Sequence, residues 1–248
     1  MEKEQRHRKP SDEMQRAAYE YNEKKYKYDA FISYRHVEPD QSIAKQVHQM
    51  IETFKPPKEF YEDGKKPIFR VFRDREELAA RDLGASIEEA LETSRYLIVI
   101  CSKRTPLSDW CQKEIETFKS LHGDERIIPV LIEGEPDESF PQALKELKRG
   151  DNESLQDVLA ADIRPDEILR ADFNGYENLQ NNNISKLKEL TKESLKLLKI
   201  EKYRIMATIL GCSFGDLKQR DKERKNKLIL TVSSMAGAVF LIFGLFMA

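Results

Sequence analysis

The stretch RYLIVICS (residues 95–102) decides the fold, because it is an almost unbroken run of apolar and β-branched side chains. Such a run is typical of a strand that is buried on both faces of a sheet. After a short loop comes SDWCQKEIETF (residues 108–118), in which Cys111, Ile115 and Phe118 recur at helical spacing. The two segments together predict a central strand followed by a helix that covers the sheet.

Strands and helices alternate on both sides of this central strand. Further strands are predicted at YDAFISY (28–34), IFRVF (68–72), RIIPVLIEG (126–134) and VLAADIR (158–164), and a long closing helix at 184–210. This alternation predicts an α/β fold, a flavodoxin-like open parallel sheet of about five strands flanked by helices. In such sheets ligands bind beyond the carboxyl ends of the strands, so the loops after the strands are the candidate site.

The C-terminal run LILTVSSMAGAVFLIFGLFMA (228–248) contains no charged side chain. About 20 apolar residues suffice for a helix to cross the hydrocarbon core of a bilayer. The preceding run, KQRDKERKNK (218–227), is rich in Lys and Arg, which favours the cytoplasmic side for that flank. We therefore expect a single-pass transmembrane helix, a lipid bilayer as partner and a cytoplasmic main domain; a buried core helix is the alternative.

Four parts of the chain follow from these patterns. Residues 1–27 are highly charged and poor in large apolar side chains, which predicts a disordered leader. The α/β domain with its closing helix is expected at 28–210, a basic juxtamembrane linker at 211–227 and the transmembrane helix at 228–248. The chain is then either tail-anchored or the front portion of a longer protein, and the sequence leaves both interpretations open.

Composition argues against two classes of function. The chain has 42 Lys and Arg against 44 Asp and Glu, so it lacks the excess of positive charge expected for nucleic-acid binding. Its three cysteines, Cys101, Cys111 and Cys212, are widely spaced, and its four histidines form no helical pair. We therefore expect reduced thiols and no metal site.

Glu114 is the candidate catalytic residue. Ser108 or Asp109 can cap the helix that carries it. Glu114 follows Cys111 by three residues and Trp110 by four, so it lies at the edge of the buried face. A carboxylate at that edge can face a cleft at the strand ends. The alternative is an ordinary surface glutamate beside a structural tryptophan.

Four blocks, YDAFISYRH, FRDREEL…DLGASIEEAL, YLIVICS and SDWCQKEI, follow one another between residues 28 and 134. In this order they resemble the Toll/interleukin-1 receptor (TIR) domain, and the resemblance extends to the closing helix. The likeness is strongest to bacterial, plant and axon-degeneration TIR domains, many of which cleave NAD⁺. It is weaker to animal receptors, whose loop after the second strand usually carries a proline-glycine pair. Here that loop reads RDREELAARDLG (73–84) and has no proline.

The resemblance implies an enzyme, an NAD⁺ nucleosidase that cleaves the nicotinamide–ribose bond and needs no cofactor beyond NAD⁺ as substrate. Its catalytic glutamate stands in a Trp-x-x-x-Glu or Ser-x-x-Cys-x-x-Glu pattern, and Glu114 satisfies both. The resemblance further implies other TIR domains as partners in a homo-oligomer, activation by that self-association, and a role in bacterial immune defence.

The remaining positions taken from the resemblance are expected to bind substrate: Ser33, Tyr34, Arg35, His36, Phe72, Asp74, Ser108, Trp110 and Cys111. Each has a structural alternative. His36 can be an exposed loop histidine, Phe72 a core residue and Asp74 a solvated loop charge. Cys111 as a nucleophile has no histidine placed to activate it.

Two other functions stay open at this stage. A membrane-anchored TIR domain can act as a scaffold that assembles with other TIR domains and turns over nothing. An enzyme with the same carboxylate can instead form a cyclic or conjugated ADP-ribose. Nicotinamide release separates the scaffold from the enzymes, and mass spectrometry of the products separates the enzymes from one another.

Overall fold

The computed structural model describes residues 26–61, 64–73, 83–147, 159–165 and 181–247. The chain divides into two compact units. The first comprises residues 1–54 and 68–211, and the second comprises 55–67 and 212–248. The predicted leader falls almost entirely on residues 1–25, outside the described residues.

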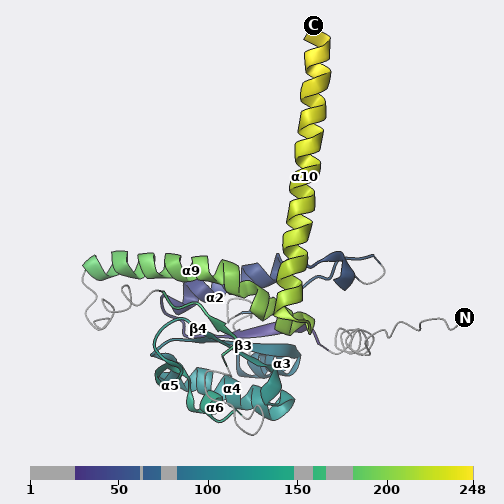
Figure 1. Ribbon diagram of the computed structural model, residues 1–248. Helices are drawn as coiled ribbons and strands as arrows, with labels where there is room; N and C mark the ends of the chain where they lie inside the picture. Colours follow the sequence, from purple (N-terminus) through teal and green to yellow (C-terminus); the bar gives the residue numbers. More distant parts are fainter. Residues whose placement is uncertain (1–25, 62–63, 74–82, 148–158, 166–180, 248) are drawn as a thin grey trace, which may run out of the picture. The chain divides into compact units, whose positions relative to one another are not determined.

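The first unit is built on a parallel five-stranded sheet in the order β2-β1-β3-β4-β5. Figure 1 shows β3 and β4 of this sheet among the helices. The strands are β1 (Tyr28–Ser33), β2 (Val71–Phe72), β3 (Ser94–Cys101), β4 (Ile127–Leu131) and β5 (Ala161–Asp162). The predicted α/β fold with an open parallel sheet is therefore confirmed. β3 lies at the centre, and seven of its eight residues are buried.

The two edge strands are shorter than their sequence patterns predict. β2 and β5 have two residues each, against five in IFRVF and seven in VLAADIR. Both pair with a neighbour on one side only. A strand at the edge of a sheet has fewer hydrogen bonds to extend it, so an apolar run there predicts more strand than forms.

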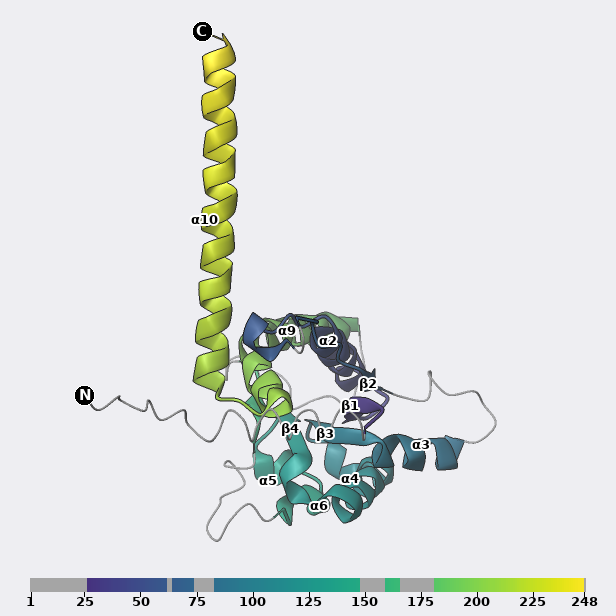
Figure 2. The same cartoon turned by 90° about the vertical axis from the view of Figure 1, so that its right-hand side faces the viewer.

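Helices cover both faces of the sheet. Figure 2 shows α2 (Asp40–Glu52) and α9 (Asn181–Leu210) on one face, and α3 (Leu83–Glu92), α4 (Asp109–His122) and α6 (Gln142–Lys145) on the other. The short α5 (Pro136–Ser139) follows β4. α2 turns Ile43, Ala44, Val47 and Ile51 into the core, and α4 turns Cys111, Ile115 and Phe118. These are the apolar stripes that the helical periodicity predicts.

The second unit combines residues 55–67, which include a 3₁₀ turn at Lys58–Phe60, with α10 (Phe214–Met247). Arg224 of α10 donates from Nη1 to the carbonyl oxygens of Lys55 (2.7 Å) and Pro56 (3.2 Å). The buried carboxylate of Asp221 pairs with Arg224 and with Nζ of Lys225. The residues predicted as a basic linker are thus helical from Phe214 onwards.

The structure leaves the predicted transmembrane helix untested. Among the described residues, no helix is both long enough and apolar enough to span a bilayer. Backbone helix continues to Met247, but the side chains of Leu228, Val232 and residues 235–248 lie outside the description. The expectation for 228–248 therefore rests on the amino-acid sequence.

Candidate functional site

A cleft of about 270 Å³ opens at the carboxyl ends of β1 and β2. Strand order reverses between β1 and β3, and at such a switch point the following loops diverge and leave room for a ligand. Most of the residues predicted to bind substrate line this cleft. Four apolar residues that the resemblance did not indicate also line it, namely Phe31, Ile32, Val37 and Ile87. The lining residues are Phe31, Ile32, Tyr34, Arg35, His36, Val37, Phe72, Ile87, Ser108, Trp110 and Glu114.

The start of α4 positions the candidate carboxylate. Ser108 is the N-cap of this helix, and its Oγ accepts a hydrogen bond from the backbone N–H of Cys111 (3.3 Å). One of the two predicted caps is thereby confirmed. With the helix phase set in this way, Cys111 and Ile115 point into the core, and Glu114 lies at the margin of that core, in the cleft.

Glu114 is held by a residue 81 positions away in the chain. Ser33, the last residue of β1, donates from Oγ to Oε2 of Glu114 at 2.6 Å. Ser33 is buried and Glu114 is partly buried. A short hydrogen bond to a partly desolvated carboxylate restricts its rotamers and directs it towards the cleft.

The aromatic side chains of the cleft differ sharply in exposure. Trp110 is 56 % exposed, whereas Tyr34 is 4 % exposed and its ring packs at 4.8 Å from that of His36. Phe72 is 2 % exposed and stacks on Phe31 with ring centroids 5.2 Å apart. Phe72 is therefore a core residue that closes the cleft from below. Trp110 is the most exposed of these three aromatic side chains, Tyr34, Phe72 and Trp110.

Cys111 is buried beneath the cleft. Burial raises the pKa of its thiol to about 11, and hydrogen bonds with Ser108 and Ser33 oppose that rise. The neutral thiol is a poor nucleophile, so Cys111 acts in packing. All three cysteines are free thiols in the structure. The described residues contain no group of three or more His, Cys, Asp or Glu side chains that could hold a metal ion.

A buried polar network joins the two loops that wall the cleft. Asp40, at the start of α2, is 1 % exposed and accepts from Oγ of Ser102 at 3.0 Å. The backbone N–H of Ser102 donates to Oγ1 of Thr105 (2.8 Å), and the backbone N–H of Ser108 donates to the Thr105 carbonyl (3.0 Å). A chain of hydrogen bonds thus runs from the β1–α2 loop to the cap of α4.

Sequence reasoning missed Asp40, because an acid in the first turn of a helix is usually a solvated partner of the helix dipole. Desolvation raises the pKa of Asp40 to about 7, although the Ser102 hydrogen bond and the charge of Arg35 lower it. The neighbouring charge of Glu133, whose own pKa is raised by burial, acts in the same direction as desolvation. The buried acid therefore titrates near neutral pH.

Arg35 brings a cationic donor to the cleft. Its Nη1 atom is buried and makes no hydrogen bond with the described residues. An uncompensated donor of this kind is costly unless a ligand supplies an acceptor. The side chain is therefore suited to an anionic group such as a phosphate.

Comparison with known proteins relates part of the chain to one family. Residues 58–173 match the sequence model of the TIR domain family. This part of the chain is similar to TIR domains. A protein named NAD(+) hydrolase ApTIR, from Actinoplanes sp., is 33 % identical to it over 110 residues, which is 44 % of this chain and 14 % of that protein. The chain thus spans a small part of the length of this relative.

One solved structure that was compared with this chain is that of the activated Roq1 resistosome directly recognizing the pathogen effector XopQ (TIR domains). It is 18 % identical, and the match covers 69 % of this chain and 84 % of that one, with a TM-score of 0.34. A TM-score this low does not establish a shared fold. In this chain, Asp74 and most of the 73–84 loop lie outside the described residues, and the predicted role of Asp74 stays a prediction.

Proposed function

We propose that this TIR domain is an NAD⁺ glycohydrolase, with Glu114 as its catalytic carboxylate. The observation that carries the proposal is the short Ser33–Glu114 hydrogen bond inside a cleft at the switch point of the sheet. The 33 % identity to a protein named as an NAD⁺ hydrolase supports the same activity. Neither a surface glutamate nor a scaffold needs a carboxylate held in this way.

The chemistry requires one carboxylate. The bond between the nicotinamide nitrogen and C1′ of the ribose breaks, and its electron pair goes to the ring nitrogen, so cationic nicotinamide leaves as a neutral molecule without a general acid. C1′ becomes oxocarbenium-like and is captured by water, which loses a proton. NAD⁺ and water thus yield nicotinamide, ADP-ribose and a proton. Ordinary glycosidases need a second carboxyl group because their leaving group must be protonated.

Four residues in or beside the cleft have roles that follow from their positions. Glu114 stabilises the positive charge that develops on the sugar and accepts hydrogen bonds from the ribose hydroxyls. Ser33 orients Glu114. Arg35 offers its buried donor to the pyrophosphate, and Trp110 offers its exposed face to a base.

The test is nicotinamide release by the full chain in detergent micelles, with Glu114→Gln as the variant. Removing a charge that stabilises the transition state is expected to lower kcat by about 100-fold or more. The matched control is Glu116→Gln, at an exposed position on the same helix, which should leave kcat unchanged. Glu114→Gln turning over at the rate of the unmodified chain would end the proposal. No release by the unmodified chain at any protein concentration would favour the scaffold.

The product is a separate question, because capture of the same sugar cation by another nucleophile gives a cyclic or conjugated ADP-ribose. Hydrolysis is proposed on the basis of the named relative. Mass spectrometry of the product formed in ¹⁸O-labelled water tests whether the reaction is hydrolysis. Incorporation of one heavy oxygen into ADP-ribose is the expected result, and a product without it contradicts hydrolysis.

Self-association of the TIR domain, activation through it and a role in bacterial immune defence are further proposals, supported by the family resemblance. If association activates the enzyme, specific activity should rise with protein concentration. Specific activity that stays constant over the range in which light scattering detects oligomers would contradict this.

Membrane attachment through 228–248 is proposed from the sequence, with the TIR domain on the cytoplasmic side. An uncharged run of 21 residues behind a Lys- and Arg-rich flank supports it. The full chain should remain in the membrane fraction after alkaline carbonate extraction, whereas a chain ending at residue 227 should not. Equal extraction of both would contradict the proposal.

A further inference from the structure

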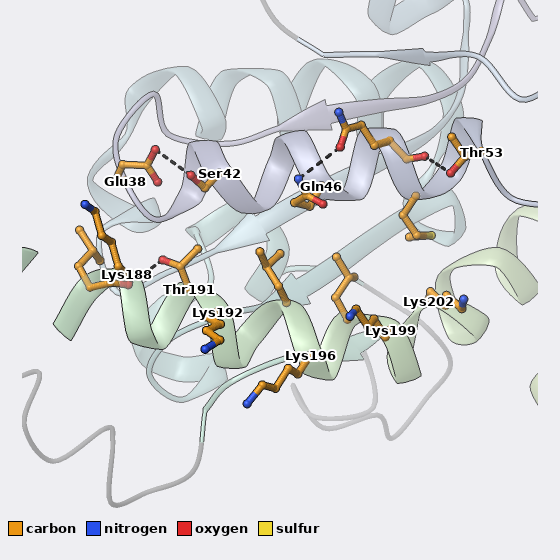
Figure 3. A pocket seen from close by; sticks show the side chains of 15 residues that line it. Glu38, Ser42, Gln46, Thr53, Lys188, Thr191, Lys192, Lys196, Lys199 and Lys202 are labelled. Atoms are coloured by element: carbon orange, nitrogen blue, oxygen red, sulfur yellow. Dashed lines mark hydrogen bonds between the residues drawn. The ribbon is translucent and has the colours of Figure 1, made fainter. Parts of the chain in front are cut away.

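A larger hollow lies between α2 and α9, on the face of the sheet that these two helices cover (Figure 3). Its volume is about 1030 Å³. All of its lining residues belong to the first unit, and the catalytic carboxylate is not among them. They are Glu38, Ser42, Gln46, Gln49, Met50, Thr53, Leu187, Lys188, Thr191, Lys192, Leu195, Lys196, Leu198, Lys199 and Lys202. We call this hollow the α2–α9 groove.

The two rims of the α2–α9 groove differ in charge. The α9 side carries a row of five lysines at intervals of three or four residues: Lys188, Lys192, Lys196, Lys199 and Lys202. At a rise of 1.5 Å per residue, the row extends along the helix for about 20 Å. The α2 side presents the uncharged side chains of Ser42, Gln46, Gln49 and Thr53. Apolar side chains lie between the rims, namely Met50, Leu187, Leu195 and Leu198.

The lysine row places like charges close together along α9. Like charges four residues apart destabilise a helix. Lys196 pairs with Glu193 at 2.6 Å, but an ion pair this exposed contributes little. Of the charged residues that line the groove, Glu38 alone is acidic, and it accepts a hydrogen bond from Ser42 at one end. Along most of its length the groove therefore attracts negative charge.

We propose that the α2–α9 groove binds an acidic amphipathic helix of a partner protein. The apolar side chains of such a helix, three and four residues apart, fit the apolar floor, and Asp or Glu residues along one flank face the lysine row. Charge complementarity on one rim alone also sets the direction and register of the helix. A nucleic acid or an anionic membrane would match the lysines but would make no use of a floor recessed between two helices.

The probe is an 18-residue synthetic helix with leucines along one face and glutamates along one flank. Its binding to the full chain in detergent is measured by fluorescence anisotropy. Lys192→Glu/Lys199→Glu should weaken binding at least tenfold, as should replacement of the peptide's glutamates by glutamine. The matched control, Lys45→Glu/Lys222→Glu, makes the same change in net charge at exposed positions outside the groove and should leave the dissociation constant within twofold.

Three outcomes would overturn the proposal. One is equal loss of binding in the groove variant and the control variant, which would indicate long-range charge alone. Another is equal binding of the glutamate and glutamine peptides. The third is that the peptide does not bind, whereas phosphatidylserine vesicles or a 20-nucleotide oligothymidine do bind and Lys192→Glu/Lys199→Glu weakens that binding. This result would assign the lysine row to lipid or nucleic acid. Circular dichroism of each variant checks that α9 remains folded.

Discussion

The cleft and the α2–α9 groove are two hollows of one unit, and the smaller one has the features of a reaction site. The cleft has about 270 Å³ and the groove about 1030 Å³. In the cleft, Ser33 from β1 and Glu114 from α4 meet at 2.6 Å, and the Asp40–Ser102 pair braces the walls. In the groove, the five lysines form a single rim along α9. Convergence of polar groups from separate elements, rather than volume, distinguishes a site for chemistry from a surface for docking.

The two hollows differ in their polar groups because they form in different parts of the fold. The cleft lies at the carboxyl ends of β1 and β2 in a hydrogen-bonded sheet, where backbone positions are rigid enough to hold a carboxylate to a fraction of an ångström. The groove lies between the outer surfaces of two helices, where long lysine side chains adapt to what they meet. Four substitutions test this contrast, in order of decreasing effect.

Phe72→Ala should have the largest effect on stability. Phe72 is 2 % exposed and stacks on Phe31, so truncation leaves a cavity that costs about 3–5 kcal/mol of unfolding free energy. Denaturant unfolding measures this cost. Ile68→Ala is the control, because Ile68 lies in the same predicted strand yet is 77 % exposed; its effect should be within about 0.5 kcal/mol. A small effect of Phe72→Ala would indicate that Phe72 stacks on the ligand and does not stabilise the core.

Asp40→Asn tests whether the carboxyl group in the Asp40–Ser102 hydrogen bond, which links the walls of the cleft, carries a proton below pH 7. Asp40 has an ordinary pKa of 3.8 and a folded-state pKa of about 7, so between these values the folded protein holds a proton that the unfolded chain has released. Its contribution to stability is therefore present at acid pH and is lost as the pH rises through 7. Asparagine keeps an acceptor for Ser102 and does not titrate.

We compare the unfolding free energy of the Asp40→Asn variant with that of the unmodified chain. The difference, variant minus unmodified chain, should increase by about 2 kcal/mol as the pH rises from about 5 to about 8. Arg35 and Glu133, whose charges act on Asp40, are present in both proteins. Asp137→Asn, at an exposed position, controls for the loss of a carboxyl group. A difference for Asp40→Asn that does not change with pH would show that Asp40 is ionised throughout this range.

Trp110→Ala should change substrate binding more than stability. Trp110 is 56 % exposed, so its removal should cost less than about 1 kcal/mol of unfolding free energy. Loss of a stacking face worth about 0.5–1.5 kcal/mol should raise KM for NAD⁺ by up to about tenfold with little change in kcat. Leu107→Ala, at an exposed position that does not line the cleft, is the control. A fall in kcat at constant KM would contradict the stacking role.

Lys192→Glu/Lys199→Glu should have no effect on the reaction. Neither lysine lines the cleft, and charges separated by more than about 10 Å in salt are largely screened, so kcat/KM for NAD⁺ should stay within about twofold. Steady-state nicotinamide release at 0.15 M salt measures it. A large change in kcat/KM would show that the cleft and the α2–α9 groove are coupled, and the two would then not be separate functional regions.

Much of the cleft could be predicted, because its parts are local patterns. The cap at Ser108 and the buried phase of α4 follow from the spacing of a few residues, and together they place Glu114 at the edge of the core. The partners of Glu114 and Ser102 could not be predicted in this way. Ser33 and Glu114 are 81 residues apart, and Asp40 and Ser102 are 62 apart, so chain folding alone brings them together.

By itself, the amino-acid sequence determined the parallel α/β architecture, the order of its elements and the helix that carries Glu114. These are set by the periodicity of apolar side chains and by helix capping, which act over a few residues. The tertiary structure decided that Phe72 is buried, that Trp110 is exposed, and that Asp40 is desolvated beside Ser102. Exposure and desolvation depend on which distant segments pack together, and no local pattern contains that information.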